Sequence, residues 1–264
     1  MTNDNDNAFD LTGRVALVTG GGTGIGAAAA MLLARYGADV AIAARTVSDL
    51  EKTAAAIEAA TGRRCLVVQT DVKDEAQVVA MVQRTVGELG RIDILVNNAG
   101  GTRMGPLEDL PTKAWDAVYD LNVRSAYVAT REAGVHFRNQ RSGAIVNISS
   151  DAGIYGIRGG AHYASAKAAL QMFTTVTANE WGKYGIRVNC IAVGAIASER
   201  VVHAWNVAAI DQEEIAARTP LRRTGRPDEV AWAILFAASD AASYMTGQTF
   251  AIDGGPVLGG IPET

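Results

Sequence analysis

The sequence has few of the residues from which disulfide frameworks and metal sites are built. Its two cysteines, Cys65 and Cys190, lie far apart, each next to a branched apolar residue, and show no metal-ligand spacing. The three histidines, His136, His162 and His203, do not cluster either. We therefore predict no metal site, and we expect the two cysteines to be buried thiols in a reducing, cytoplasmic compartment.

A basic surface and a long apolar segment are also missing. The formal net charge is −4 over 264 residues, and no run of lysine or arginine could follow a phosphate backbone, so nucleic acid is not an expected partner. No apolar run reaches the ~18 residues that span a bilayer, so no membrane partner is expected. Residues 1–10 are polar and acidic without an apolar core, which predicts a disordered leader and not a signal peptide.

Proline is scarce, with 6 residues, whereas glycine is abundant, with 28, and this balance suits many tight turns between strands and helices. Seven short apolar runs alternate with stretches of helical periodicity. The runs are residues 15–18, 40–43, 66–68, 94–96, 144–148, 188–191 and 249–252. Nearly continuous apolar runs predict parallel strands buried on both faces. The sequence therefore predicts an α/β fold, a single doubly wound domain over residues 11–255 with a seven-stranded parallel sheet, helices on both faces and a tail at 256–264.

A glycine-rich turn follows the first predicted strand. The segment Thr19-Gly-Gly-Gly-Thr-Gly-Ile-Gly26 joins that strand to an alanine-rich helix. Glycines at 20, 24 and 26 let the backbone turn sharply and approach a pyrophosphate, whose charge then meets the amides and positive dipole end of the helix. The turn predicts dinucleotide binding, with a flexible turn that binds nothing as the alternative.

The end of the second predicted strand bears on which dinucleotide fits. An NAD site places an Asp or Glu there for the ribose hydroxyls, whereas this chain has Arg45. A guanidinium can pair with a 2′-phosphate and stack on adenine, which favours NADP(H) and leaves NAD(H) possible. Against this, a solvated arginine is common at a strand end, and Thr23 stands where a second basic residue often helps. Just beyond, Ser48 to Glu51 matches a capping box that would open an alanine-rich helix.

The most informative segment is Tyr163-Ala-Ser-Ala-Lys167, thirteen residues after Ser150. On a helix, side chains four residues apart share a face, so a phenol and an ammonium would lie together. A fixed cation favours the phenolate and brings proton exchange within catalytic reach. The set predicts an acid/base pair with a hydroxyl partner, while the spacing alone also suits an amphipathic surface pair.

With these features located, the chain resembles the short-chain dehydrogenase/reductase family from about residue 11 to residue 255. Four further segments match the family's motifs in its order. They are Asp71-Val72, Asn97-Asn98-Ala99-Gly100, Leu121-Asn122-Val123 and Asn189-Cys-Ile-Ala-Val-Gly194. The resemblance implies a Rossmann fold and hydride transfer between NADP(H) or NAD(H) and a carbonyl or secondary alcohol.

The resemblance also implies catalytic roles. Tyr163 would be the acid/base, Lys167 would hold the nicotinamide ribose and lower the Tyr163 pKa, and Ser150 would hydrogen-bond the substrate oxygen. Ser149 competes with Ser150, but only Ser150 keeps the thirteen-residue spacing. Asn122 would interrupt its helix and hold a water that relays protons from Lys167, or it would merely satisfy a helix kink.

A larger set is implied around the cofactor. It consists of Gly20, Gly22, Thr23, Gly24, Ile25, Gly26, Arg45, Asp71, Val72, Asn98, Ala99, Gly100, Tyr163, Lys167, Gly194, Ile196 and Ser198. The chain departs from the family in the loop expected over the nicotinamide. Val193 replaces the usual proline and Ser198 the usual threonine, so we expect a looser loop that keeps its hydroxyl.

Substrate specificity is expected in two segments, 151–162 and 199–219. The second mixes bulky apolar and acidic residues and resembles an amphipathic helix pair, which could be a lid over an apolar pocket or a contact with a neighbouring subunit. Arg103, Arg158 and Arg200 should border the cleft, where they could meet a phosphorylated carrier or remain solvated.

The resemblance leaves several functions open. It covers reductases of ketones and 3-oxoacyl thioesters, alcohol and steroid dehydrogenases, enoyl thioester reductases and, in a different class, a dinucleotide-binding sensor without catalysis. The intact Ser150, Tyr163 and Lys167 set favours a carbonyl or alcohol substrate. The family's usual assembly implies a homotetramer, with helices around 123–140 and 163–184 at one interface and the last strand near another.

Overall fold

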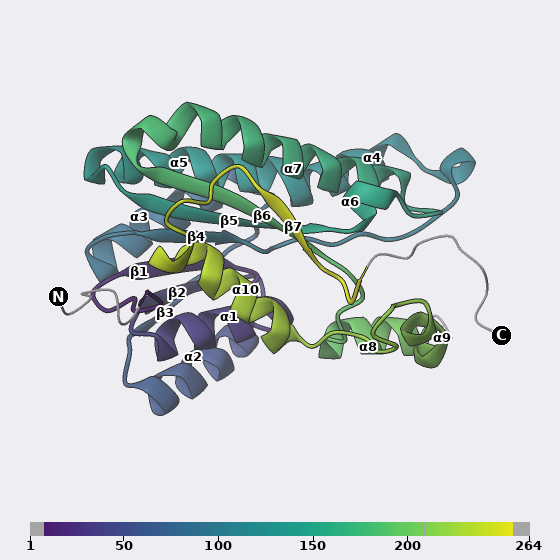
Figure 1. The fold of residues 1–264 in the computed structure, drawn as a ribbon, viewed down its shortest axis with the longest axis horizontal. Helices are drawn as coiled ribbons and strands as arrows, with labels where there is room; N and C mark the ends of the chain where they lie inside the picture. Colours follow the sequence, from purple (N-terminus) through teal and green to yellow (C-terminus); the bar gives the residue numbers. More distant parts are fainter. Residues whose placement is uncertain (1–7, 208–209, 256–264) are drawn as a thin grey trace.

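The computed structural model describes residues 8–207 and 210–255, in which seven parallel strands form one sheet in the order β3-β2-β1-β4-β5-β6-β7 (Figure 1). The strands are β1 Val15–Thr19, β2 Asp39–Ala44, β3 Cys65–Gln69, β4 Ile94–Asn97, β5 Gly143–Ser150, β6 Ile186–Val193 and β7 Thr249–Ile252. All seven predicted strands are confirmed. The order reverses between β1 and β4, and the crevice at the carboxyl ends of these strands is where such sheets bind ligands.

Two layers of helices cover the sheet, one on each face (Figure 1). The first layer is α1 Gly24–Arg35, α2 Val47–Thr61 and α10 Pro227–Ala238, and the second is α3 Glu75–Leu89, α5 Ser125–Gln140 and α7 Ala161–Trp181. Shorter helices are α4 Thr112–Tyr119, α6 Ala152–Tyr155, α8 Glu199–Val207 and α9 Gln212–Ala217, with single 3₁₀ turns at Leu107–Asp109, Gly182–Tyr184 and Asp240–Ala242.

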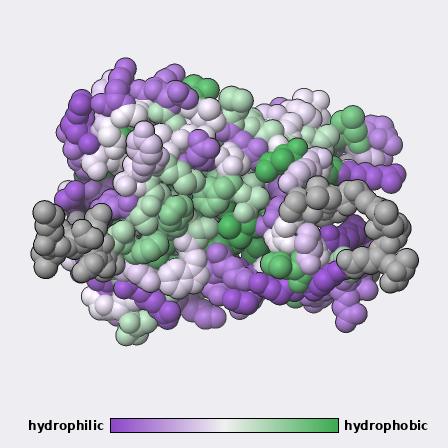
Figure 2. Space-filling model, viewed as in Figure 1, coloured by the Kyte–Doolittle hydropathy of each residue, from purple (hydrophilic) through white to green (hydrophobic). Residues whose placement is uncertain are grey.

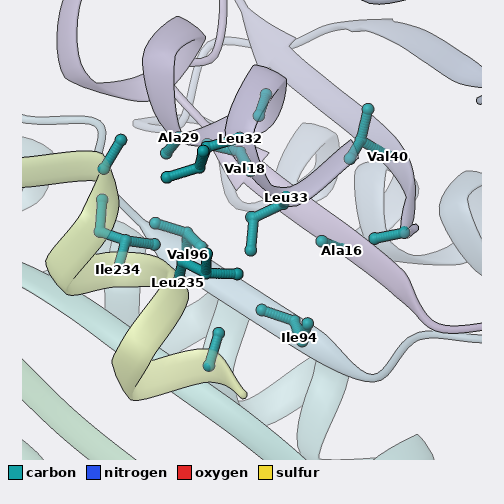
Figure 3. Close-up of a cluster of buried hydrophobic side chains, with 14 of the residues drawn as sticks. Ala16, Val18, Ala29, Leu32, Leu33, Val40, Ile94, Val96, Ile234 and Leu235 are labelled. Atoms are coloured by element: carbon teal, nitrogen blue, oxygen red, sulfur yellow. The ribbon is translucent and has the colours of Figure 1, made fainter. Parts of the chain in front are cut away.

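Successive side chains along each strand point to opposite faces of the sheet and so pack into the two layers of the core. In β1, Ala16 and Val18 pack with the α1 and α10 side chains (Figure 3). Leu17 packs on the other face, toward α3 and α5. Because residues on both faces of the strands meet helices, the strands are mostly apolar and do not alternate between apolar and polar residues. This is why the sequence showed continuous apolar runs.

Two expectations about element ends are corrected. Helix α2 begins at Val47 with Thr46 at its N-cap and no side-chain capping bond, so the capping box expected at 48–51 is wrong. Only Arg45 and Thr46 separate β2 from the helix, and Ser48 already lies in its first turn.

The folded domain also begins earlier than residue 11. The Ala241 N–H donates to the carbonyl oxygen of Ala8 at 3.0 Å, and the Phe9 ring lies edge-on to Tyr36 with centroids 6.1 Å apart. Residues 8–10, which we assigned to the leader, therefore pack against the domain. Residues 1–7, the tail at 256–264 and positions 208–209 lie outside the described residues. None of the helices in the described part of the chain is long and apolar enough to cross a membrane.

The segment 199–219 forms a helix pair, α8 and α9, as expected. The pair stands apart from both helical layers, at the end of the molecule to which the carboxyl ends of the strands point (Figure 1). Neither helix buries a side chain fully. This exposure is compatible with either a lid or a contact between subunits.

Candidate active site

The glycine turn is built by close approaches that only glycine permits. Gly20 and Gly24 have φ of 67° and 58°, in the left-handed region. A Cβ on Gly26 would overlap the Gly20 carbonyl oxygen and lie 2.6 Å from Asn98 Nδ2. Helix α1 therefore begins tight against β1, with Thr23 as an N-cap whose side chain bonds no amide. Because no Thr23 side-chain cap occupies the first amides of α1, they can meet an anion.

Asn98 holds this turn from the neighbouring strand. Its Nδ2 donates to the Thr19 carbonyl oxygen at 2.9 Å, while Thr19 Oγ1 accepts from the backbone N–H groups of Asn98 and Ala99, both at 3.0 Å. The Asn98 side chain thus acts on the backbone of β1. Ile25 is half-buried against the α1 and α10 cluster, and Gly22 faces α2.

The ends of β2 and β3 carry the residues expected at the adenosine. Arg45 is exposed, its carbonyl oxygen accepts from Gln69 Nε2 at 3.2 Å, and its guanidinium has no hydrogen bond or ion pair with any described residue. Asp71 accepts from the Lys73 N–H at 3.1 Å, and Val72 is buried beside it. Of the residues that the sequence predicted around the adenosine, Arg45 is the one with a cationic side chain.

Tyr163 and Lys167 lie on one face of α7, beside the end of β5. Lys167 Nζ lies 5.6 Å from the centroid of the Tyr163 ring and donates to the Ile148 carbonyl oxygen at 2.8 Å. Lys167 is buried, and Tyr163 is half-buried. The structure therefore brings the predicted phenol and ammonium together in a confined site.

Burial controls the proton affinities of both groups. Burial raises the Tyr163 pKa above its ordinary value, with the Asp151 charge adding to the rise and the Ser150 hydroxyl opposing it. Burial lowers the Lys167 pKa to about 8. Lys167 is not among the causes of the Tyr163 shift, so the lowering of the Tyr163 pKa by the Lys167 ammonium stays a prediction.

The two serines at the end of β5 have different surroundings. Ser149 Oγ donates to the Lys167 carbonyl oxygen at 2.9 Å and accepts from Gln171 Nε2 at 3.0 Å, so its hydroxyl serves to join β5 to α7. Ser150 Oγ instead faces Tyr163 and donates to Asp151 Oδ1 at 2.9 Å. This contrast favours Ser150 over Ser149 as the hydroxyl partner.

Asn122 interrupts its helix, as expected. It lies in a π-helical turn, Asp120–Arg124, between α4 and α5. Its Nδ2 donates to the carbonyl oxygens of Gly101 and Val118, both at 2.8 Å, and its Oδ1 accepts from the Gly101 N–H at 3.1 Å. A Cβ on Gly100 would lie 2.7 Å from Asn122 Oδ1 and 3.1 Å from Lys167 Nζ, so only glycine fits between them.

The loop after β6 folds back over the glycine turn. Val193 is the last residue of β6, and its carbonyl oxygen accepts from the Asp151 N–H at 3.1 Å. A Cβ on Gly194 would lie 2.7 Å from Asp253 Cα, and one on Gly24 would lie 3.2 Å from Ser198 Cβ. The Ile196 side chain is buried in the core, which leaves only its backbone to face a ligand.

Two residues that the sequence reasoning missed contact the site. The Asp151 carboxylate accepts from the Ser150 hydroxyl, and the buried His162 ring joins α7 to the loop after β4. Its Nε2 lies 3.1 Å from the Arg103 carbonyl oxygen and 3.2 Å from Thr102 Oγ1. A carboxylate next to the predicted serine was a signal for Asp151, whereas nothing in the sequence pattern pointed to His162.

Apolar side chains surround the mouth of the site. Met104, Ile154, Tyr155 and Ile157 are all more than 45% exposed, and they come from the loop after β4 and from the segment between β5 and α7. These two segments are joined by a hydrogen bond from the Gly105 N–H to the Gly159 carbonyl oxygen at 2.9 Å. The entrance therefore offers an apolar surface to a substrate.

Comparisons with known proteins agree with this geometry over nearly the whole chain. A family model described as enoyl-(acyl carrier protein) reductase matches residues 20–256. The chain is 39% identical over 249 residues to a 3-oxoacyl-[acyl-carrier-protein] reductase from Synechocystis, covering 94% of this chain and 98% of that protein. It is 41% identical over 243 residues to a cis-4-hydroxycyclohexanecarboxylate dehydrogenase from Sinomonas cyclohexanicum, covering 92% and 96%.

A solved structure also matches over nearly the whole chain. The L-sorbose reductase of Gluconobacter frateurii, complexed with NADPH and L-sorbose, superposes with a TM-score of 0.89 at 31% identity, covering 94% of this chain and 98% of that one. The names of these three proteins differ in substrate.

Proposed function

The chain belongs to the short-chain dehydrogenase/reductase family, and we propose that within this family it reduces ketones or 3-oxoacyl thioesters reversibly with NADP(H). As a member it is an oxidoreductase that transfers a hydride between a nicotinamide cofactor and a carbonyl or alcohol. The observation that carries the proposal is the meeting of Ser150, Tyr163 and Lys167 beside Gly100, where the sheet ends. The non-catalytic sensor is set aside, because the matched relatives are named reductases and dehydrogenases.

The residues present fit a nicotinamide dinucleotide. The glycine turn leaves the amide end of α1 open for a pyrophosphate, and Gly100 leaves room beside Asn122 and Lys167 for a ribose. Gly194, Ile196 and Ser198 would face the nicotinamide, with Ile196 acting through its backbone. Once bound, the cofactor supplies the hydride.

The protein's own groups handle the proton and the developing charge. In reduction, Tyr163 gives its phenolic proton to the substrate oxygen as the carbonyl becomes an alkoxide. Ser150 donates a hydrogen bond to the same oxygen, and Lys167 stabilises the phenolate that remains. Asn122 is anchored through Gly101 at the side of Lys167, where a proton relay to solvent would start.

We propose NADP(H) as the preferred cofactor because the exposed Arg45 guanidinium is free to pair with a 2′-phosphate. The NADPH in the complex of the sorbose reductase is consistent with this choice. The free thiols Cys65 and Cys190 support a reducing, cytoplasmic setting.

A second candidate function is the reduction of enoyl thioesters, which the description of the matched family model favours. That reaction places the hydride on a carbon–carbon double bond. Ser150 and Tyr163 are hydrogen-bonding neighbours, and two hydroxyl groups placed together suit a carbonyl oxygen as their common acceptor. We therefore rank carbonyl reduction first.

We also propose a homotetramer. Tyr127 on α5 and Met172 and Val176 on α7 are exposed apolar residues on the second helical layer. Among the described strands, β7 pairs with β6 alone and lies at the edge of the sheet, and an apolar area lies over β7 and α10 on the visible face (Figure 2). Exposed apolar faces and an open edge of this kind are ordinarily covered by another subunit.

The test is a substrate panel followed by product analysis. NADPH and NADH oxidation is measured over 3-oxoacyl thioesters, cyclic ketones, steroid ketones and enoyl thioesters, and deuterium from 4-labelled NADPH is located in the product. The proposal predicts deuterium on a carbinol carbon. Label found only on a saturated acyl carbon would favour the enoyl reaction instead, and turnover with none of these compounds would contradict both.

A further inference from the structure

Asp151 is held firmly beside the hydroxyl of Ser150. Its backbone N–H donates to the Val193 carbonyl oxygen at 3.1 Å, which continues the β5–β6 pairing by one residue. Its Oδ1 accepts from Ser150 Oγ at 2.9 Å and from the Ala152 N–H at 2.7 Å. The backbone and Oδ1 of Asp151 are therefore both held in place beside Ser150.

The hydrogen bond to Asp151 uses the only proton of the Ser150 hydroxyl. A hydroxyl has one proton, and here Asp151 accepts it, while the Ser150 oxygen accepts from the Ala152 N–H at 3.1 Å. To donate to a substrate oxygen, Ser150 must turn away from a charge-assisted hydrogen bond. Asp151 therefore sets the resting orientation of Ser150.

The charges facing this point are mixed. Burial and the nearby Asp253 carboxylate raise the pKa of Asp151, while the bonds from Ser150 and Ala152 lower it. Lys167 faces the site from α7, where its ammonium is occupied by the Ile148 carbonyl oxygen, and Cys190 of β6 faces Lys167. The carboxylate of Asp151 is therefore the charge in direct contact with the hydroxyl that meets the substrate.

The arginines predicted to border the cleft lie farther out. Arg103 and Arg158 are exposed on the segments that form the mouth, and Arg200 is exposed at the start of α8. A phosphorylated carrier held at the rim would thus meet positive charge, whereas the reacting end would meet a negative one.

We propose that Asp151 is a specificity-determining residue that orients Ser150 and excludes substrates carrying a carboxylate one methylene away from the reacting carbonyl, so that neutral ketones and thioesters are accepted. The inference rests on the proposed function and deepens it. A carboxylate brought close to a half-buried like charge is repelled, and the low local dielectric strengthens the repulsion.

The test compares acetoacetamide with acetoacetate, which have nearly the same shape and differ by one charge. In the wild type, we expect kcat/KM with NADPH to be at least about tenfold higher for the amide, the scale of a single like-charge contact. Asp151→Asn keeps an acceptor for Ala152 and should bring the ratio close to one, mainly by lowering KM for acetoacetate. Asp228→Asn, which removes a surface carboxylate paired with Arg226, should leave the ratio unchanged.

A pH profile separates charge from structural damage. Because the Asp151 charge contributes to the raised Tyr163 pKa, Asp151→Asn should move the midpoint of alcohol oxidation to lower pH. Damage to the fold would lower kcat without moving the midpoint.

An unchanged amide-to-acid ratio in Asp151→Asn, or a wild type that prefers acetoacetate, overturns the inference. If neither compound is turned over, the proposed function loses support. The inference is then decided by binding of the two compounds to the NADPH complex, read from quenching of NADPH fluorescence. The ratio of the two dissociation constants, measured on wild type, Asp151→Asn and Asp228→Asn, then takes the place of the kcat/KM ratio.

Discussion

Lys167 is a buried charge at the centre of the site, and its burial links folding to pH. Its pKa in the folded protein is lowered to about 8, whereas an unfolded lysine titrates near ~10.4. Between these values the folded protein has lost the proton and the unfolded chain still binds it, so stability rises with pH across this window. Below about pH 8 the folded protein carries the full cost of the buried ammonium.

Lys167→Met should reveal this cost. Between about pH 7 and pH 10, the wild type should gain about 2 kcal/mol of stability that the variant does not gain. The unfolding free energy of the variant minus that of the wild type should therefore fall by this amount. Urea unfolding of the cofactor-free proteins measures it. The exposed Lys183 gives a control, since Lys183→Met should show a difference that is constant with pH. A constant difference for Lys167→Met would contradict the depressed pKa.

Arg45 is a second single residue whose substitution gives a test, here of cofactor choice. Arg45→Ala should raise KM for NADPH by about tenfold and leave KM for NADH nearly unchanged, because the guanidinium has only the 2′-phosphate to pair with. Steady-state kinetics with both cofactors decides it. Equal changes in KM for NADPH and NADH would show that Arg45 does not bind the 2′-phosphate.

Single residues differed in how far the sequence could place them. Tyr163, Lys167 and Ser150 were predictable because helix and strand spacing fixes their relative positions. The raised pKa of Tyr163 was not, since it depends on depth of burial, which spacing does not give. The contact of His162 with the Arg103 carbonyl oxygen was also hidden, because the two lie 59 residues apart in the chain.

At the scale of elements, the strands were predictable because both of their faces meet helices. Their ends were less so, because the polar residues that extend β1, β4 and β5, such as Thr19, Asn97 and Ser150, carry no apolar signal. The start of α2 at Val47 depends on the short connection from β2 and not on a capping motif.

The turn from β1 to α1 gives a prediction about an element junction. Gly26→Ala would force a methyl group into the Gly20 carbonyl oxygen, and we expect a loss of about 2 kcal/mol or more in stability and of NADPH binding. Gly87→Ala, inside α3 where a Cβ meets nothing within 4 Å, is the matched control. It should stabilise the protein by up to about 1 kcal/mol and leave NADPH binding intact. Chemical unfolding measures the stability of the two variants, and NADPH fluorescence measures their cofactor binding. A Gly26→Ala variant with the stability and NADPH binding of the wild type would refute the close approach.

At the scale of the whole molecule, the sheet order with its reversal between β1 and β4 places the glycine turn, the end of β4 and the end of β5 around one crevice. The doubly wound architecture was predictable from the alternation of strands and helices. The position of the helix pair α8 and α9 was not, because few of its residues pack against the core.

The apolar face of α5 and α7 leads to a prediction about assembly. Native mass spectrometry should find a particle of four chains of 27.6 kDa each. Val176→Glu places a charge on the exposed face of α7 and should produce smaller particles, whereas Leu107→Glu, at a 66% exposed site on the loop after β4, should not. A wild-type monomer would contradict the proposed tetramer.

The central claim is that Tyr163 supplies the proton for hydride transfer to a carbonyl. The most direct measurement is the single-turnover rate of NADPH oxidation by Tyr163→Phe with the best substrate of the panel, beside the wild type, with NADPH affinity measured on both. We expect the rate to fall by about 100-fold or more while NADPH affinity is retained, because the variant lacks only the proton donor. A rate close to that of the wild type would show that another group donates the proton and would contradict the account.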